Sequence, residues 1–140
     1  MKIDGACLCG QFKYEAEIDP AKVVVCHCTD CQIGSASAFR YGVLVPHDCF
    51  KRLSGELKTY VKTAESGHKR ALAFCPDCGT QIYGTDPGAE TSYSLRLGTA
   101  RQRYDLEPKV QVWRRSAVGW LGRIDGLRAH ATQPDKLRRA

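Results

Sequence analysis

The chain has 140 residues with a formal net charge of +6, and 43% of its residues are apolar. This length allows one hydrophobic core and is too short for two comfortable domains. The sequence contains no apolar run of about 18 residues, which a membrane-spanning helix requires, and no signal-peptide pattern at its start, so we expect a cytoplasmic protein. The positive charge suggests an anionic partner, but basic residues occur in short pairs, which favours an ordinary solvated surface.

Most of the chain has the pattern of short strands separated by turn residues, which predicts an all-β fold. In residues 12–18 apolar side chains alternate with charged ones, as expected of a first strand with one exposed face. The later β-type segments are residues 23–25, 39–45, 57–61, 71–74, 93–97 and 110–113. The aromatic residues that these patterns mostly assign to the core are Tyr41, Tyr60, Tyr83, Trp113 and Trp120.

Turn residues mark the connections between these segments. Ser54-Gly55-Glu56 predicts a tight hairpin turn that joins residues 50–53 to residues 57–61. Asp86-Pro87-Gly88 predicts a second loop. Residues 29–34 are expected to form a helical turn, and no longer segment has a helical period.

The predicted domain organisation is simple. Residues 1–131 are expected to form one zinc-binding domain. Residues 132–140 are polar and lack a hydrophobic face, so we expect them to be a loosely packed tail. Neither an internal repeat nor a low-complexity segment interrupts this arrangement.

Seven of the eight cysteines fall in three clusters, which indicates metal binding, because structural disulfides are rare in reducing compartments. Cys7-Leu8-Cys9-Gly10 and Cys75-Pro76-Asp77-Cys78-Gly79 resemble two matching zinc knuckles, in which each glycine accepts a positive φ. Cys7, Cys9, Cys75 and Cys78 together predict a closed structural zinc site. In a small domain the free energy of binding such a metal is largely folding free energy.

A redox-active dithiol is the alternative interpretation of Cys75 and Cys78, because two residues separate them and one is a proline. Such dithiols normally begin a helix that follows a strand. Here residues 79–83 have the pattern of a knuckle that continues into another strand. The sequence therefore favours zinc.

The middle cluster, Cys26-His27-Cys28-Thr29-Asp30-Cys31, has three cysteines and no obvious fourth ligand. Catalytic zinc typically has three protein ligands and an open position, so Cys26, Cys28 and Cys31 predict a second, catalytic zinc. His27 or Cys49 would close the site if either were a ligand. We expect His27 to act indirectly, through its neighbours, and Cys49 to be an apolar, buried residue.

Three thiolates leave a zinc site with about one negative charge, which makes it a weak Lewis acid. Such a soft ion still binds an incoming thiolate and keeps it deprotonated. We therefore expect a thiol substrate that adds to a small carbonyl compound, or the reverse cleavage of a carbon–sulfur bond.

The three cysteine clusters, together with residues 5–10, 74–80 and 108–113, resemble the glutathione-dependent formaldehyde-activating enzyme family, which includes centromere protein V. This resemblance implies coiled, tent-like β-sheets around a structural zinc. It implies two zinc ions per chain, with the same division of ligands as above. It also implies a carbon–sulfur lyase that joins glutathione to formaldehyde, so that the expected partners are a small-molecule thiol and a small aldehyde.

Glutathione carries two carboxylates, for which Arg40, Lys51 and Arg70 are candidate partners by their proximity in sequence to the ligand segments. Solvated surface charge is the favoured interpretation of all three. The alternative function is a zinc-ribbon binding module for nucleic acid or protein without catalysis. Nucleic-acid binding would require exposed aromatic residues beside clustered Lys and Arg, and the strand patterns do not predict them. The sequence predicts no particular oligomeric state.

Overall fold

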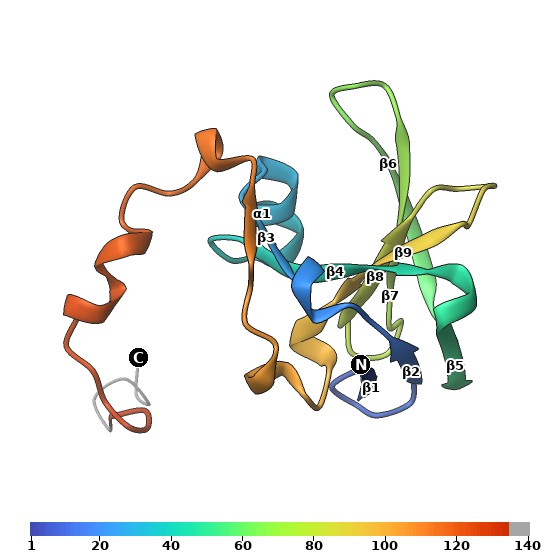
Figure 1. The fold of residues 1–140 in the computed structure, drawn as a ribbon, viewed down its shortest axis with the longest axis horizontal. Coiled ribbons are helices and arrows are strands. Elements are labelled where there is room, and N and C mark those ends of the chain that lie inside the picture. The colour runs from blue at the N-terminus through green and yellow to red at the C-terminus, as the bar shows by residue number, and fades with distance from the viewer. Residues whose placement is uncertain (135–140) are drawn as a thin grey trace.

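The computed structural model describes residues 1–134, and these residues form mainly β-strands in two sheets (Figure 1). The three-stranded sheet has the antiparallel order β1 (Lys2–Ala6), β2 (Lys13–Glu17) and β5 (Phe50–Ser54). The seven-stranded sheet has the order β10 (Val110–Val112), β3 (Val24–Cys26), β4 (Arg40–Pro46), β9 (Ser92–Arg96), β8 (Gln81–Thr85), β7 (Lys69–Phe74) and β6 (Lys58–Thr63). The prediction of an all-β fold is confirmed.

Helical structure within the described residues is short. The predicted helical turn is present as α1 (Thr29–Ser35). The 3-10 segments are Pro20–Lys22, His47–Cys49, Leu97–Thr99, Arg103–Asp105, Arg114–Ser116 and Leu121–Gly126. In the part of the chain that is described, no helix is long and apolar enough to cross a membrane.

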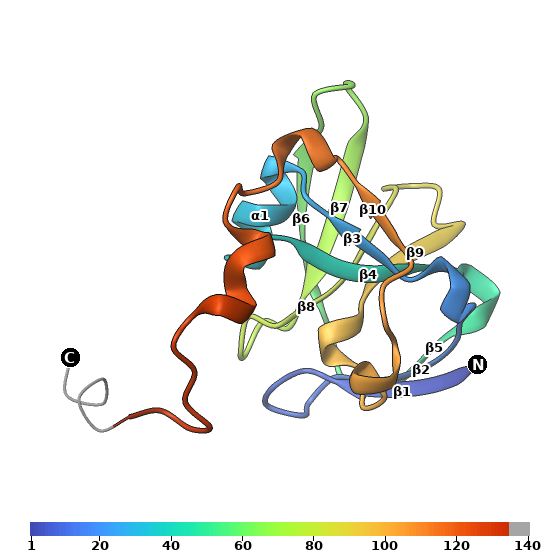
Figure 2. The ribbon, with the colours of Figure 1, turned by 60° about the vertical axis from the view of Figure 1, so that its left-hand side comes forward.

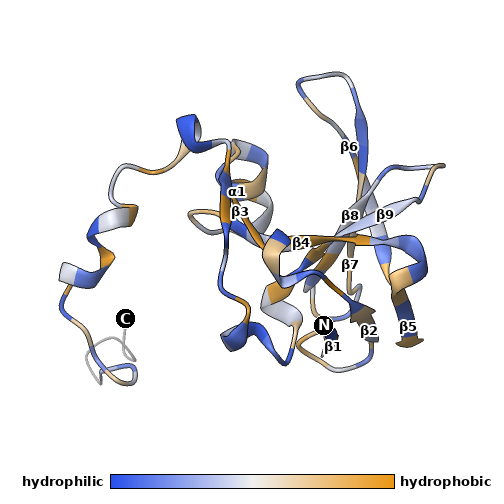
Figure 3. Cartoon of the chain, viewed as in Figure 1, coloured by the Kyte–Doolittle hydropathy of each residue, from blue (hydrophilic) through white to orange (hydrophobic). Residues whose placement is uncertain are grey.

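The core lies between the two sheets. Phe12, which directly precedes β2, and Tyr14 of β2 are buried in one cluster with Val43, Val45 and Leu95 from the large sheet. Figure 3 shows the matching hydrophobic colour along β4, where it passes the small sheet. The alternation of side chains along each strand therefore gives the large sheet one apolar face towards the core and one opposite face, which carries polar residues.

Two predictions about the strands are wrong. Residues 12–18 contain the second strand, because β1 precedes it and pairs with it. The hairpin at residues 54–56 does not form, because β5 pairs with β2 whereas β6 pairs with β7. Gly55 is instead a corner between the sheets, where its φ is +81° and a Cβ atom would lie 2.3 Å from the Gln11 carbonyl oxygen.

The side chain of Gln11 takes the place of a hairpin partner at this corner. Its Nε2 donates to the Glu56 carbonyl oxygen at 2.8 Å, and its Oε1 accepts from the Glu56 N–H at 3.1 Å. A glycine turn between two β-type segments is therefore compatible with either a hairpin or a crossover between sheets. Here the hydrogen bonds from the distant residue Gln11 stabilise the crossover. The predicted loop at residues 86–88 does connect two paired strands, β8 and β9.

After β10 the chain leaves both sheets as an extended segment, residues 113–134, which we call the C-terminal arm (Figures 1 and 2). The prediction that the aromatic residues are core residues is wrong at three positions, because Tyr60 is 64% exposed, Trp113 is 48% exposed and Trp120 is 51% exposed. Tyr60 lies on β6, at the edge of the large sheet. Residues 132–134 of the predicted tail are described, and residues 135–140 lie outside the described part.

Candidate metal centres

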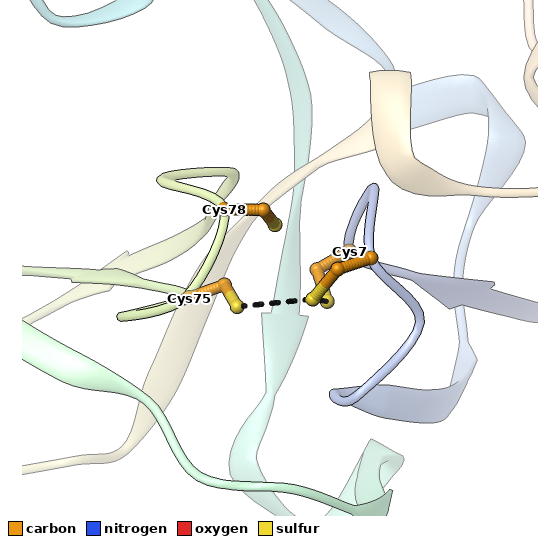
Figure 4. A group of neighbouring side chains, drawn as sticks. Cys7, Cys75 and Cys78 are labelled. Atoms are coloured by element: carbon orange, nitrogen blue, oxygen red, sulfur yellow. Dashed lines mark hydrogen bonds between the residues drawn. The ribbon is translucent and has the colours of Figure 1, made fainter.

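Four cysteines from two turns, one in each sheet, come together in the structure. Cys7 and Cys9 lie in the turn between β1 and β2, and Cys75 and Cys78 lie in the turn between β7 and β8. Figure 4 shows Cys7 facing Cys75 and Cys78 across this gap. The glycines that end the turns, Gly10 and Gly79, have φ values of +80° and +74°, as the knuckle interpretation predicts.

The spacing of the four sulfur atoms fits a tetrahedral zinc ion. All four Sγ atoms lie within 4.8 Å of one another. The Cys7–Cys9 distance is 3.6 Å and the Cys9–Cys75 distance is 3.7 Å. Zinc–sulfur bonds of about 2.3 Å place tetrahedral neighbours about 3.8 Å apart, so the sulfurs already have the geometry that the ion requires.

Neighbouring groups donate hydrogen bonds to these sulfurs, as expected around thiolates. The Phe12 N–H donates to Cys7 Sγ at 3.3 Å, and Gln11 Nε2 donates to Cys75 Sγ at 3.1 Å. Burial raises the pKa of the Cys75 thiol. Hydrogen bonds from the Gln11 amide and from backbone N–H groups lower it by a larger amount, so the pKa lies below its usual value.

The remaining two thiols have pKa values that differ strongly. Hydrogen bonds from Thr80 lower the pKa of Cys78 to about 5. A backbone hydrogen bond at Gln11 lowers the pKa of Cys9, but burial and the adjacent sulfurs together raise it to about 12. Four sulfurs this close cannot all become thiolates without a cation among them, because like charges disfavour further ionisation. The site therefore suits a divalent metal ion.

The second cluster forms where β3 ends and α1 begins. Cys26 is the last residue of β3, Cys28 is the N-cap of α1, and Cys31 lies in its first turn. The Cys31 N–H donates to Cys28 Sγ at 3.1 Å, and the Sγ atoms of Cys26 and Cys31 are 3.2 Å apart. The three sulfurs lie within 4.8 Å of one another, and no fourth metal-binding side chain joins the group among the described residues.

One feature of this cluster differs from the prediction of three free thiols, because a disulfide joins Cys28 and Cys31. Formation of this bond removes two protons and two electrons from the pair. Metal binding requires the reduced, deprotonated form of the same sulfurs. Cys26, Cys28 and Cys31 therefore form a set of three metal donors when the pair is reduced.

The two residues that would have closed the second site lie elsewhere. His27 is fully buried, and its Nε2 lies 2.8 Å from Gln111 Oε1 of β10. Its ring thus ties β3 to its parallel neighbour β10. Cys49 is half-buried and packs against the hydrophobic core, away from both cysteine groups. Neither residue belongs to a cysteine group, and the indirect role expected of His27 stays a prediction.

The face of the large sheet that turns away from the core carries three arginines, and we call it the arginine face. Arg40 of β4 is the direct partner of Cys26 on β3, and Arg96 of β9 is the direct partner of Gly42. Directly opposed residues point to the same side of a sheet, as do residues two apart on one strand. Cys26, Arg40 and Arg96 therefore share one face.

Arg70 reaches the same face from β7. It lies two residues before Leu72, which pairs with Gly84 of β8, and Gly84 pairs with Ser94 of β9. The guanidinium of Arg70 forms an ion pair with Asp86. The sequence named Arg40 and Arg70 as candidates by proximity, and it missed Arg96. The third candidate, Lys51, is exposed on β5 of the other sheet, where its register partner is Glu15.

A family model described as glutathione-dependent formaldehyde-activating enzyme matches residues 2–116. The chain belongs to this family. The resemblance drawn from the cysteine clusters is thus confirmed, and the matched region contains all seven clustered cysteines and the three arginines. The C-terminal arm begins just before the end of the match.

One curated relative and one solved structure are similar to this family member. An uncharacterized lyase of Schizosaccharomyces pombe is 32% identical over 93 residues, which are 66% of this chain and 64% of that protein. A crystal structure of a Rhodobacter sphaeroides protein has the same fold, with a TM-score of 0.61 at 17% identity. That match covers 78% of this chain and 99% of the other.

In this formaldehyde-activating enzyme family member, two hollows lie on the α1 side of the large sheet. One, of about 800 Å³, is lined by Asp30 and Ile33 of α1, by β6 and β7, and by Gly79 of the four-cysteine site. The other, of about 420 Å³, is lined by Arg40, Arg96 and the end of α1. Gln81 lines both, and its side chain donates to the Gly34 carbonyl between them. Both volumes suit a small organic ligand.

Proposed function

We propose that this chain is a zinc-dependent carbon–sulfur lyase that adds glutathione to formaldehyde, or cleaves the resulting adduct. Two zinc ions per chain would be bound, one by Cys7, Cys9, Cys75 and Cys78 and one by Cys26, Cys28 and Cys31. Residues 1–131 would form the single domain that binds both. A reducing compartment such as the cytoplasm would keep the second set of cysteines in the thiol form.

The observation that carries this proposal is the contrast between the two cysteine groups. The first offers four sulfurs at tetrahedral spacing, which closes a metal site completely. The second offers three sulfurs, and no fourth donor joins them among residues 1–134. An incomplete set leaves a position for an exogenous ligand. Family membership and a relative named as a lyase support the reaction class.

The reaction needs a thiolate beside a small carbonyl carbon. A zinc ion bound by the three cysteines would hold the thiol of the substrate in its deprotonated form at neutral pH. That thiolate would donate an electron pair to the aldehyde carbon, so that a carbon–sulfur bond would form as the C=O π bond breaks, and the carbonyl oxygen would take up a proton equivalent to the one released by the thiol. In this step the main contribution of the protein would be to hold the metal donors in fixed positions. Cys28 caps α1 and Cys26 ends β3, so both donors are fixed by secondary structure.

Native mass spectrometry of freshly reduced protein tests the proposal. We expect two zinc ions per chain and an additional glutathione adduct. In the Cys28→Ser variant we expect one zinc ion and no adduct. Cys49→Ser is the matched control, because it also removes one cysteine but lies outside both groups, and it should keep two ions and the adduct.

Catalysis is measured separately. The exchange between free glutathione and its hydroxymethyl adduct can be followed by NMR with carbon-13 formaldehyde, and the protein should accelerate it above the spontaneous rate. Loss of this acceleration in Cys28→Ser but not in Cys49→Ser would support the assignment. Two bound zinc ions without any uptake of glutathione by the unmodified protein would contradict it.

One observation favours the second candidate, a binding module for nucleic acid. Trp113 and Trp120 are about half exposed, and the guanidinium of Arg115 lies 5.0 Å from the ring centre of Trp113. Exposed aromatic rings beside arginines are the elements from which single-strand binding surfaces are built. Retention on single-stranded DNA that falls steeply between low and physiological salt would support this candidate, and absence of retention at low salt would exclude it.

A further inference from the structure

The side chain of Arg96 is buried without a complete set of partners. It is 6% exposed, and its Nη1 donates to the carbonyl oxygen and to the hydroxyl of Ser94, at 2.8 and 3.1 Å. Its Nε, however, has no hydrogen-bond partner among the described residues. An unsatisfied buried donor is costly, and more so on a charged group. The structure therefore contains a cation whose hydrogen bonds are incomplete.

The chain makes room for this guanidinium. Gly84 lies beneath it, and a Cβ atom at that position would be 3.1 Å from Arg96 Nη2 and 3.3 Å from Leu72 Cδ2. A side chain at residue 84 would therefore crowd the guanidinium. The glycine is consistent with a site in which the position of Arg96 matters, because a strand interior otherwise gains nothing from glycine.

Arg40 lies beside Arg96 and forms no ion pair within the described part of the chain. Burial lowers the pKa of Arg40, and burial together with the charges of Arg40 and Arg70 lowers that of Arg96. Because both pKa values are lowered, keeping the two arginines charged costs free energy in the folded protein. A bound anion would remove that cost.

The charged groups around Arg40 and Arg96 do not neutralise the positive charge of these two arginines. Arg70 is paired with Asp86, and Lys62 is paired with Asp30. The remaining opposite charge nearby is Cys26, whose thiolate would attract both guanidiniums. Even three thiolates on a divalent metal carry only about one negative charge, so two unpaired arginines leave about one positive charge uncompensated.

The two arginines face a space that is large enough for a ligand. Arg40 and Arg96 line the hollow of about 420 Å³, together with Ser35, Phe39 and Gln81. Arg40 is also the strand partner of Cys26, which belongs to the three-cysteine group. A molecule in this hollow would thus contact the guanidinium groups of Arg40 and Arg96, on a strand that pairs with the strand ending at Cys26 and on its other neighbour.

We propose that Arg40 and Arg96 bind a carboxylate group of the substrate and thereby restrict this protein to thiols that also carry an acid group. Arginine suits this role because its planar fork matches a carboxylate with two parallel hydrogen bonds. The carboxylate supplies an acceptor for Arg96 Nη2, which forms no hydrogen bond among the described residues and is not one of the fully buried atoms, and it neutralises the excess charge. The thiol end of this inference rests on the proposed function, whereas the carboxylate end rests on the arginines alone.

The test uses S-methylglutathione, which has both carboxylates of glutathione but no free thiol. Its affinity for the reduced protein is measured by isothermal titration calorimetry at low chloride. We expect binding to the unmodified protein, displacement by excess acetate, and no binding of the diethyl ester of the same compound. In Arg40→Gln and Arg96→Lys the dissociation constant should rise at least about tenfold, as expected when one charge-assisted pair is lost.

Arg52→Gln is the matched control, because Arg52 is an exposed arginine on β5 that pairs with Glu56, and its affinity should equal that of the unmodified protein. Arg96→Lys keeps the charge, and circular dichroism checks its fold, while Arg40→Gln provides a second variant at a half-buried position. Equal affinity in all proteins, equal binding of the diester, or no binding of S-methylglutathione to the unmodified protein would overturn the inference. Binding that depends on Arg40 and Arg96 would uphold it even if no thiol is taken up and the proposed lyase activity fails.

Discussion

The hydroxyl of Thr80 lies 3.1 Å from Cys78 Sγ and also 3.1 Å from the backbone nitrogen of Leu8. It accepts from the Leu8 N–H and donates to the sulfur, so one side chain joins the knuckle after β1 to the knuckle before β8. This bridge spans 72 residues of sequence. Thr80 therefore both positions the two halves of the four-cysteine site and stabilises the thiolate of Cys78.

Replacement of Thr80 by valine should make zinc release more sensitive to acid. The Thr80 hydrogen bonds lower the pKa of Cys78 to about 5, so this sulfur is deprotonated above that pH and protons compete with metal only below it. Without the hydroxyl the pKa rises towards its usual value, and the pH at which half the zinc is released should rise as well. A colorimetric zinc chelator measures release across a pH series. An unchanged release curve would contradict this role for Thr80.

The two cysteine groups should differ in their importance for stability. Cys78→Ser should unfold or aggregate the protein, because the four-cysteine site joins a turn of the three-stranded sheet to a turn of the seven-stranded sheet. Cys28→Ser should remove the second metal with little effect on the fold, because that group spans only β3 and α1. Melting curves by circular dichroism decide this. Similar damage from both changes would show that the division into structural and catalytic groups is wrong.

Oxidation should control the metal content of the second group. Because Cys28 and Cys31 form a disulfide, the oxidised protein should bind one zinc ion fewer than the reduced protein. Treatment with dithiothreitol followed by zinc should restore the second ion, and native mass spectrometry counts the ions in each state. Equal zinc content before and after reduction would argue against this exchange.

Glycine is required at position 5 for a reason that the sequence does not reveal. A Cβ atom there would lie 2.4 Å from the hydroxyl of Tyr14 and 2.5 Å from the Thr99 carbonyl oxygen. Gly5→Ala should therefore lower the free energy of unfolding by about 1–3 kcal/mol through overpacking. Gly98→Ala is the control, because its Cβ would meet no atom within 4 Å. Urea denaturation of both variants measures the difference, and equal stability would refute the argument.

The aromatic residues of the C-terminal arm should contribute little to stability. Trp113 and Trp120 are about half exposed, so replacing both by alanine should change the free energy of unfolding by less than about 1 kcal/mol. Phe12→Ala, at a fully buried position, should cost about 3–5 kcal/mol. Thermal unfolding distinguishes the two. A large loss from the tryptophan changes would mean that the arm packs against the sheets in solution.

Local patterns in the sequence were sufficient for the two cysteine groups and for most of the strands. The knuckles could be predicted because the spacing of Cys7 and Cys9 and the positive φ of Gly10 are properties of a few adjacent residues. The strand at residues 93–97 was predicted for the same reason, since its side chains alternate. That alternation also places Ser94 and Arg96 on one face, opposite Tyr93 and Leu95.

The sequence by itself thus determined the cysteine groups, the all-β class and the family. Only the tertiary structure decided which sheet each strand joins, as at Gly55, because strand pairing depends on distant partners such as Gln11. The burial of Arg96 is also a tertiary property. An arginine on the polar side of a strand is normally solvated. Arg96 is enclosed because the end of α1 and Arg40 of β4 come together around it, and no local pattern contains that information.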